Sequence, residues 1–363
     1  MATRKAVSLQ DVARKAGVSV STASRVLNTK LDLHLFSEDS IKRVRRAAME
    51  LQYRPNRNAQ ALSSGKTYVL GVTAEMRPGR NLFEIGYFAS LMGGVELALR
   101  ESGYEARIIG ARNDQSAVDR GREHYHQRRI DGLIHVSYLD PGSYERLVED
   151  RHVPCVLVEE VLRATSLPAL GVDYEAGLTE VVQHLAELGH KRVLWLGPDV
   201  RIGESISRRE RAFTSAAWNA SIHGSCCRFE GYEETDDRRS HLRFLAEADE
   251  ALRAYLCEDG NFTAVVCYND DTAAGAYRGI ARAGRQVGRD IAVIGFDDER
   301  GARYLSPELT TVNPGLDRAG HRAAEILIEM VETPDAAEKL RGYQERIKPR
   351  LVVRGSTMRV SKD

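Results

Sequence analysis

The chain has 363 residues, 42% of them hydrophobic and 29% charged, which predicts two or three globular domains and excludes a membrane protein, because no apolar run approaches the ~18 residues of a membrane span. The formal net charge is zero, but residues 1–66 carry 13 Lys and Arg against 5 Asp and Glu, while residues 67–363 carry 39 against 47. A basic N-terminal module on a mildly acidic body is typical of a nucleic-acid-binding arm, although a solvated basic tail has the same composition.

The basic N-terminus is followed by a polar helix start, Ser8 to Asp11, instead of the apolar core of a secretion signal, which predicts a cytoplasmic location. The cysteines form no CxxC pair and no His/Cys group at zinc-ligand spacing. We therefore expect no metal, no other cofactor, and reduced thiols in a reducing compartment at Cys155, Cys226, Cys227, Cys257 and Cys267.

The first 28 residues have the pattern of two short helices joined by a tight turn. Ser8 can cap the first helix with Asp11 in the capping-box position, and Gly17 can end it because glycine adopts left-handed backbone without a Cβ penalty. Ser19 can cap a second helix that runs to about Asn28. Such a pair is a helix-turn-helix, whose second helix can enter the major groove of DNA, although any small helical hairpin has the same pattern.

The second helix has a small, polar outer face that suits contact with bases. Arg25 can donate a bidentate pair of hydrogen bonds to a guanine edge, and Val20 can contact a thymine methyl. Ser21 or Thr22 can bond a base or a phosphate. The residues expected to point inward are Ala23, Val26 and Leu27.

A third helix is expected to begin at the Ser37 cap and to close a three-helix core. Its inward face consists of Ile41, Val44, Ala48 and Leu51. Its outer face is basic and can contact phosphates, although a solvated charged face is equally consistent. Beyond it, Asn56 can cap a single short helix from Arg57 to Ser63, which is too short to be stable alone and should fold only when something packs against it.

From Tyr68 onward, short apolar strands alternate with amphipathic helices. Continuous apolar strands separated by helices predict parallel sheets covered on both faces, and two such sets predict two doubly wound α/β lobes. Ligands of such folds bind beyond the carboxyl ends of the strands, so we expect a site in a cleft between the lobes. The strand candidates are Tyr68–Val72, Glu105–Ile109, Gly132–Val136, Cys155–Val158, Val193–Leu196, Ala264–Tyr268 and Ile291–Gly295.

Three segments, Ser8–Asn28, Tyr53–Asn56 and Ala59–Leu62, closely resemble the headpiece and hinge of the LacI (lactose-repressor) family. The resemblance implies that the hinge helices of two subunits pair in the minor groove, where Leu62 wedges into the central base step. The loop Thr29–Phe36 is longer and more apolar than is usual in the family, which puts phosphate contacts from that loop in doubt. The implied DNA-binding residues are Ser19, Val20, Ser21, Thr22, Arg25, Asn28, Tyr53, Asn56, Arg57, Ala59 and Leu62.

The body resembles the family's sensor, which is similar to a periplasmic sugar-binding protein, in the segments Val172–Gly177, Leu188–Lys191, Ser207–Phe213, Tyr268–Asp270 and Ile294–Asp298. The resemblance places Arg209, Asn269 and Asp297 where family members bind effectors, and suggests two further contacts, Glu159 and Asp173. Arg donates a planar fork, Asp accepts and Asn does both, which suits vicinal hydroxyls or a small anion. Local alternatives remain open: Asn269 could cap a helix, Asp297 could form an Asx turn, and Arg209 could lie on a helix surface.

The resemblance also implies a domain plan: a headpiece at 1–55, a hinge and linker at 56–66, and an effector-binding and dimerisation domain at 67–363. In this architecture the chain crosses three times between a first and a second lobe. The expected lobe boundaries are about 67–170 plus 312–342 for lobe one, and about 171–311 plus 343–356 for lobe two.

The function implied is that of a homodimeric, ligand-responsive transcriptional regulator bound to a pseudo-palindromic DNA operator, most simply a repressor of carbohydrate-use genes released by a sugar-like effector. A purine or nucleoside co-repressor is the alternative effector. A sugar- or nucleotide-acting enzyme is the alternative class, but the sequence has no GxGxxG, P-loop, GxSxG or HExxH motif and no candidate catalytic residue. A transport-type binding protein is disfavoured by the helix-turn-helix pattern.

Overall fold

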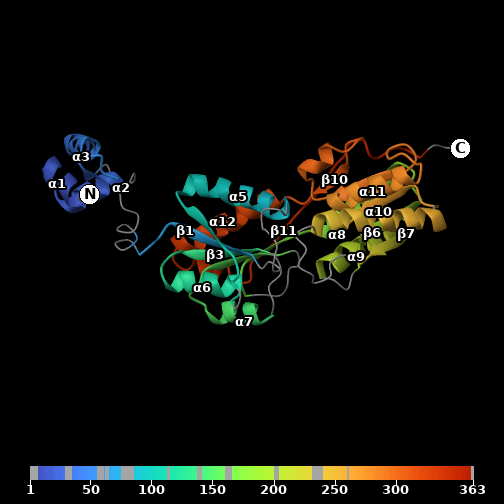
Figure 1. Ribbon diagram of the computed structural model, residues 1–363. Coiled ribbons are helices and arrows are strands. Elements are labelled where there is room, and N and C mark those ends of the chain that lie inside the picture. Colours follow the sequence, from blue (N-terminus) through green and yellow to red (C-terminus); the bar gives the residue numbers. More distant parts are fainter. Residues whose placement is uncertain are drawn as a thin grey trace. The chain divides into compact units, whose positions relative to one another are not determined.

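A computed structural model of the chain describes residues 7–28, 35–54, 61, 65–74, 86–112, 115–136, 141–159, 166–199, 204–230, 240–259 and 261–360. The chain divides into two compact units, Met1–Tyr68 and Val69–Asp363 (Figure 1). The first unit holds the three helices of the headpiece. The second holds two sheets, which we call lobe one and lobe two.

The headpiece helices begin and end where the expected caps lie. Ser8 and Asp11 form a complete capping box, and Gly17 ends the first helix with a φ of 64°. The Ser19 hydroxyl accepts a hydrogen bond from the Thr22 amide at 3.0 Å, and the Ser37 hydroxyl accepts one from the Ser40 amide at 3.3 Å. The helices are α1 (Leu9–Ala16), α2 (Val20–Asn28) and α3 (Glu38–Glu50).

A small apolar core joins these helices. Val44 is fully buried between α1 and α2, and Ala47, which was not among the expected inward residues, is buried beside it. The expected core residues Ile41, Ala48 and Leu51 are only partly buried around this centre. Phe36, the last residue of the longer loop, also packs against the core, so at least the end of that loop contributes to headpiece packing.

Lobe one is a parallel sheet whose described strands follow the order β11-β5-β4-β3-β1-β2. Its central strand β3 is buried along its whole length. Helices α5 and α12 cover one face and α6 and α7 the other (Figure 1). The elements are β1 (Val69–Ala74), α5 (Gly86–Ser102), β2 (Glu105–Ile109), α6 (Ala117–His126), β3 (Gly132–Val136), α7 (Pro141–Glu149), β4 (Cys155–Glu159), β5 (Ala169–Val172), α12 (Leu316–Glu332), α13 (Ala336–Lys339) and β11 (Gln344–Ile347).

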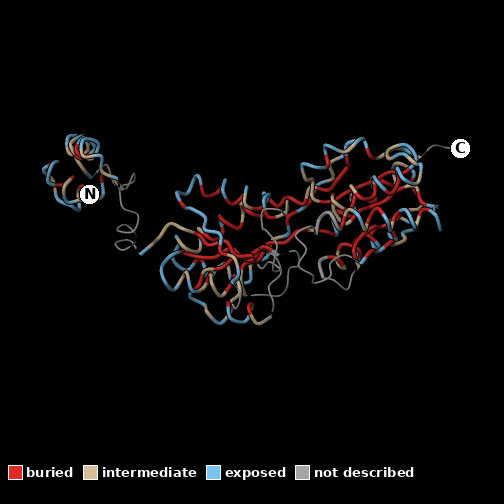
Figure 2. Tube along the Cα trace, viewed as in Figure 1, coloured by how far each residue is buried: buried red, intermediate tan, exposed pale blue. Residues whose placement is uncertain are grey.

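Lobe two repeats this plan with the strand order β12-β10-β9-β8-β6-β7, in which only β12 is antiparallel to its neighbour. Helices α10 and α11 lie on one face, and α8 and α9 on the other (Figure 1). The buried strands appear as continuous runs at the centre of each lobe (Figure 2). The elements are α8 (Tyr174–Glu187), β6 (Arg192–Pro198), α9 (Glu204–Asn219), β7 (His223–Phe229), α10 (Ser240–Asp259), β8 (Ala264–Cys267), α11 (Asp270–Arg282), β9 (Ala292–Phe296), η4 (Arg300–Arg303), β10 (Thr310–Asn313) and β12 (Arg350–Val352).

The two doubly wound lobes expected from the sequence are confirmed, and each of the seven strand candidates occurs within a residue or two of its expected ends. The expected boundary at 343 was wrong for one strand. β11 pairs in parallel with β5 in the sheet of lobe one, whereas 343–356 had been assigned to lobe two. Because β11 is a polar edge strand with a single buried residue, no apolar run marks it in the sequence.

The cysteines form no disulfide. Burial raises the pKa of the Cys226 and Cys227 thiols to about 11, so both stay protonated at neutral pH and are poor nucleophiles.

Within the described ranges, no helix is both long and apolar enough to cross a membrane.

Lobe one depends on very close packing of α5 against α12. A Cβ atom added to Gly320 on α12 would overlap the carbonyl oxygen of Leu91 on α5, whereas one added to Gly93 would meet nothing within 4 Å. We predict that Gly320→Ala lowers the free energy of unfolding by about 1–3 kcal/mol through overpacking. Gly93→Ala, the control on the same pair of helices, should raise it by about 0.5–1 kcal/mol. Urea unfolding followed by circular dichroism measures both, and equal effects would contradict the proposed backbone contact.

Candidate functional site

Arg209 on α9 is the best-buried charged residue of the candidate effector site, with 3% of its surface exposed. Its guanidinium carbon lies 4.7 Å from the ring centroid of Tyr174, 4.7 Å from that of Tyr268 and 4.5 Å from that of Phe296. Its Nη1 donates a hydrogen bond to the Tyr268 carbonyl at 3.0 Å, and its Nη2 donates to the Tyr174 hydroxyl at 3.3 Å. The alternative of a surface arginine is therefore wrong, and the guanidinium is fixed in one orientation.

Asp297 lies against this guanidinium at the carboxyl end of β9. Its Oδ1 is 3.6 Å from Nη1 of Arg209, and the side chains are 4% exposed for Arg209 and 13% exposed for Asp297. The backbone of Asp297 has a φ of 109°, and that of Asp298 has a φ of 51°. Non-glycine residues with positive φ are uncommon and cluster at functional sites, because the surrounding structure must hold them there.

The turn after β9 is held by a second ion pair. Arg354 donates to Asp298 Oδ1 at 2.5 Å, and Asn313 donates to Asp298 Oδ2 at 3.0 Å. Arg354 and Asp298 are themselves nearly buried. The turn that carries Asp297 is thus tied to β10 and to the segment after β12, which restricts the position of the Asp297 carboxylate.

Two other candidates serve as helix caps. Asn269 Oδ1 accepts hydrogen bonds from the Thr272 amide at 2.9 Å and from the Thr272 hydroxyl at 2.7 Å at the start of α11. Asp173 Oδ1 accepts from the Ala176 amide at 3.1 Å at the start of α8. The capping role that the sequence left open for Asn269 is confirmed. Their chain neighbours Tyr268 and Tyr174 contact the Arg209 guanidinium.

The fifth candidate, Glu159, is the last residue of β4 in lobe one. Its side chain lies outside the described residues, and so do the loop segments 75–85, 137–140, 160–165 and 200–203. The described part of the site therefore belongs to lobe two.

The candidate DNA contacts fall into four groups. Val20, Ser21 and Arg25 are exposed on the outer face of α2, with 44% of Val20 accessible. The Thr22 and Ser19 hydroxyls lie 2.8 Å apart and hydrogen-bond to each other at the start of α2. Tyr53 packs partly buried on the headpiece core. The side chain of Asn28 and the hinge residues Asn56, Arg57, Ala59 and Leu62 lie outside the described residues.

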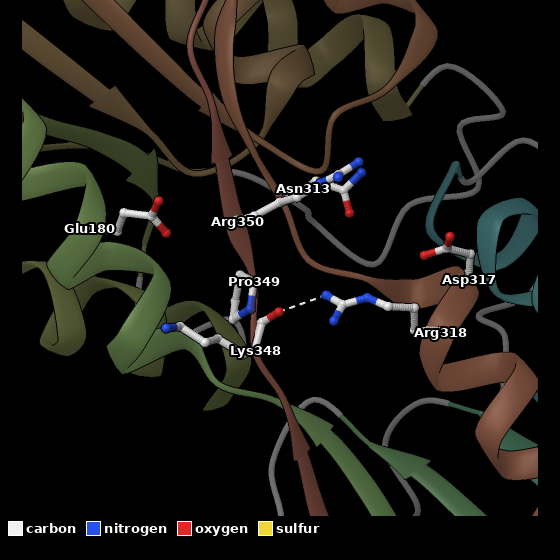
Figure 3. A pocket seen from close by; sticks show the side chains of 7 residues that line it. All are labelled: Glu180, Asn313, Asp317, Arg318, Lys348, Pro349 and Arg350. Atoms are coloured by element: carbon white, nitrogen blue, oxygen red, sulfur yellow. Dashed lines mark hydrogen bonds between the residues drawn. The ribbon is translucent and has the colours of Figure 1, made fainter.

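A described pocket lies where the chain passes between the lobes. Its volume is about 520 Å³, and Figure 3 shows Arg318 reaching from the start of α12 to the Lys348 carbonyl, a bond of 2.6 Å. None of the five effector candidates lines it, so it is not the expected cleft. It is lined by Glu180, Asn313, Asp317, Arg318, Lys348, Pro349 and Arg350.

Asp270 is a buried carboxylate beneath the site that was not among the candidate site residues. Its Oδ1 accepts from the Thr311 hydroxyl at 2.6 Å, and its Oδ2 accepts from the Glu299 amide at 2.8 Å. Burial, together with the nearby charge of Asp297, raises the pKa of Asp270 well above its ordinary value. Asp270 and Tyr174 both lie in segments that resemble the family's sensor, Tyr268–Asp270 and Val172–Gly177, and this was the available signal. Arg354 lies in no such segment.

The raised pKa of Asp270 gives a pH-dependent prediction. The folded chain holds the Asp270 proton more tightly than the unfolded chain does. Protonated Asp270 therefore stabilises the fold fully below the unfolded pKa of about 3.9, and this contribution is lost as the pH rises towards the pKa of the folded chain. We expect the free energy of unfolding of Asp270→Asn to rise relative to wild type above pH 4, by at most about 1.4 kcal/mol per pH unit. Urea unfolding at pH 4 to 8 measures this, with the exposed Glu250→Gln as control; a constant difference would contradict it.

The sequence matches two family models. Residues 8–56 match "Bacterial regulatory proteins, lacI family", and residues 182–357 match "Periplasmic binding protein-like domain". The chain is 30% identical to the ribose operon repressor of Escherichia coli (strain K12) over 96% of this chain and 99% of the relative. It is 28% identical to the HTH-type transcriptional repressor PurR of Mannheimia succiniciproducens, with 97% and 99% covered.

Solved structures agree on the fold. The Lac repressor bound to ONPG superposes with a TM-score of 0.76 at 24% identity, covering 97% of this chain and 100% of that chain. The transcriptional regulator CelR in complex with cellobiose superposes with a TM-score of 0.64 at 22% identity, covering 97% and 100%. With near-complete coverage by a relative at 30% identity, the chain belongs to the LacI family of bacterial transcriptional regulators.

Proposed function

We propose that this ligand-responsive, DNA-binding regulator is a homodimeric repressor of carbohydrate-use genes, released from a pseudo-palindromic operator by a sugar-like effector. The choice of effector class rests on the Arg209–Asp297 pair, which lies at the carboxyl ends of the strands of lobe two. A planar donor beside a fixed acceptor matches two adjacent hydroxyl groups of a sugar, which both donate and accept hydrogen bonds. We place this activity in the cytoplasm.

The rigid setting of the pair supports this choice. Three aromatic rings hold the Arg209 guanidinium by its faces, and the turn around Asp297 is tied through Asp298 to Arg354. A preorganised site binds its ligand without first paying to order its side chains. Asn269 and Asp173 support the pair as caps and complete the polar edge, and Glu159 is the proposed contribution of lobe one.

The names of relatives favour small effectors of two classes. They include a ribose operon repressor and a GalR regulator from Escherichia coli (strain K12), and PurR repressors. Two LacI-family structures hold bound ribose. Each is 21% identical to this chain, which is evidence for a shared fold and not for a shared ligand. A pentose or hexose is therefore our first choice, and a purine is the alternative.

A thermal-shift panel of D-ribose, D-galactose, ribose 5-phosphate and hypoxanthine tests the effector class. A sugar that binds only the folded state should raise the melting temperature of wild type, since a ligand at 100 times its Kd adds about 2.7 kcal/mol of stability. The shift should disappear in Asp297→Ala and persist in the exposed Glu250→Gln. Stabilisation by hypoxanthine and by none of the sugars would show that the effector class is wrong.

DNA binding is proposed to use α2 in the major groove and the segment 56–63 in the minor groove. In the described residues, the Gly65 amide donates to the Ala61 carbonyl at 2.8 Å. The match of residues 8–56 to the lacI family model supports this mode, and a Lac repressor dimer of similar fold has been solved bound to its operator.

We predict that Leu62→Ala lowers operator affinity because it removes the side chain that would unstack the central base step. That unstacking costs about a few kcal/mol, which contacts to the bent duplex more than recover. Binding to random-sequence DNA depends on phosphate contacts and should be nearly unchanged. Fluorescence anisotropy titrations at several salt concentrations measure both. Equal losses of affinity for operator and random-sequence DNA would show that Leu62 does not act by insertion between the central bases.

A further inference from the structure

A cluster of basic side chains lies at one corner of lobe one. Arg128 and Arg129 lie exposed in the turn between α6 and β3, and Arg107 lies exposed on the edge strand β2. Nη1 of Arg107 donates to the Arg129 carbonyl at 3.1 Å, which joins the strand to the turn. In the described part of the chain, neither Arg128 nor Arg129 has an acidic side chain as an ion-pair partner. We call these three residues the amino-edge cluster.

Most of the charged side chains that act on His124, beside this cluster on α6, are positive. Burial lowers the pKa of the neighbouring His124, and the charges of Arg129, Arg107 and Arg120 lower it further, against the opposing charge of Glu123. This contrasts with the body as a whole, in which residues 67–363 have more Asp and Glu than Lys and Arg. A positive patch on an acidic body points to an anionic partner at this corner.

The amino-edge cluster lies where the chain enters lobe one. β1 is its first strand, and β2 and β3 run parallel to β1 with their amino ends beside Val69. The turn that carries Arg128 and Arg129 leads directly into β3, and the Asp131 amide that ends this turn donates to the Val69 carbonyl at 2.8 Å. α6, whose end leads into the turn, lies beside β1 and β3 (Figure 1).

Chain length limits how far this edge can be from the DNA. Val69 follows the proposed minor-groove segment, which ends at Ser63, by a stretch of chain that spans at most about 22 Å when fully extended. An arginine side chain that extends from this edge shortens the distance between its charge and the DNA further. Charges also interact over a Debye length of about 8–10 Å in ordinary salt. A connection of this length allows the amino edge of lobe one to approach the phosphates on either side of the proposed hinge site.

We propose that the amino-edge cluster of Arg107, Arg128 and Arg129 is a second DNA-binding surface, on the sensor domain, that contacts operator phosphates beside the minor-groove segment. This inference rests on the proposed DNA-binding mode. Phosphate contacts carry no sequence information, so the cluster strengthens binding to operator and random DNA alike. In a dimer it acts twice, once on each side of the operator centre.

The cluster also gives the effector a second way to weaken DNA binding. Movement between the lobes shifts lobe one relative to the DNA, and a contact between charges is lost when their separation exceeds the screening distance. Operator release then combines loss of the minor-groove segment with loss of these phosphate contacts.

The test uses the double variant R128N/R129Q, with Asn at 128 because its φ of 53° is left-handed and Asn tolerates that conformation. The control is Arg289→Gln, an exposed arginine before β9 in lobe two. Anisotropy titrations over a range of salt use the full-length protein and two 30-base-pair duplexes. One duplex has random sequence, and the other is selected from a random pool by the wild-type protein.

Each phosphate contact adds about 0.9 to the slope of log K against log salt. We expect the double variant to lose about 2 to 4 units of slope and at least tenfold in low-salt affinity on both duplexes, while Arg289→Gln matches wild type. The charge-preserving R128K/R129K should restore most of the slope, which separates a charge effect from a folding defect. A slope and affinity of R128N/R129Q equal to wild type would overturn the second surface. Failure of the folded wild type to bind any duplex would instead overturn the proposed DNA-binding mode.

Discussion

The structure of the body depends on how the chain passes between its two sheets. In the described part of the chain this happens three times: at Asp173, at Pro314–Gly315 and at Lys348–Pro349. The Asp173 amide donates to the Ile347 carbonyl at 3.0 Å, and Arg318 donates to the Lys348 carbonyl, so the crossings are bonded to one another. Three short, linked connections allow the lobes to hinge but not to separate, which is the motion that an effector between them can control.

The described part of the candidate effector site belongs to lobe two, where ring contacts and ion pairs hold its side chains. The buried pair of Arg209 and Asp297 lies against the rings of Tyr174 and Phe296. Tyr174 directly follows the first crossing, and Asn313, which supports the Asp297 turn through Asp298, directly precedes the second. A ligand at this pair therefore acts close to the segments about which the lobes turn. Through these crossings, a ligand bound in lobe two can change the position of lobe one, at whose first strand the linker ends.

The sequence predicted the local structure well wherever one residue decides it. Ser8, Ser19 and Ser37 each cap the helix expected of them, because a side-chain oxygen that meets a free amide is a local event. The apolar strands were predictable because parallel strands are buried on both faces. The edge strand β11 was not, since its register is set by β5, far away in the chain.

The site was predicted less completely, for a physical reason. The resemblance to the family pointed to Arg209, Asn269 and Asp297, of which Arg209 and Asp297 lie 3.6 Å apart in lobe two. It did not reveal that aromatic rings enclose Arg209, or that Arg354 holds the turn beside Asp297. Such contacts join segments separated by tens of residues and depend on the packed fold. The capping bonds of Asn269 show its role at the start of α11.

In the proposed function, one equilibrium between lobe arrangements links the effector to the operator. The direct test measures four dissociation constants by titration: operator with and without the effector found in the thermal-shift panel, and effector with and without operator. Linkage requires the effector to change the operator dissociation constant by the same factor by which the operator changes the effector dissociation constant. This factor is on the order of 5–150-fold for a coupling of 1–3 kcal/mol. Effector binding that is unchanged by saturating operator, in protein that binds both, would contradict the account.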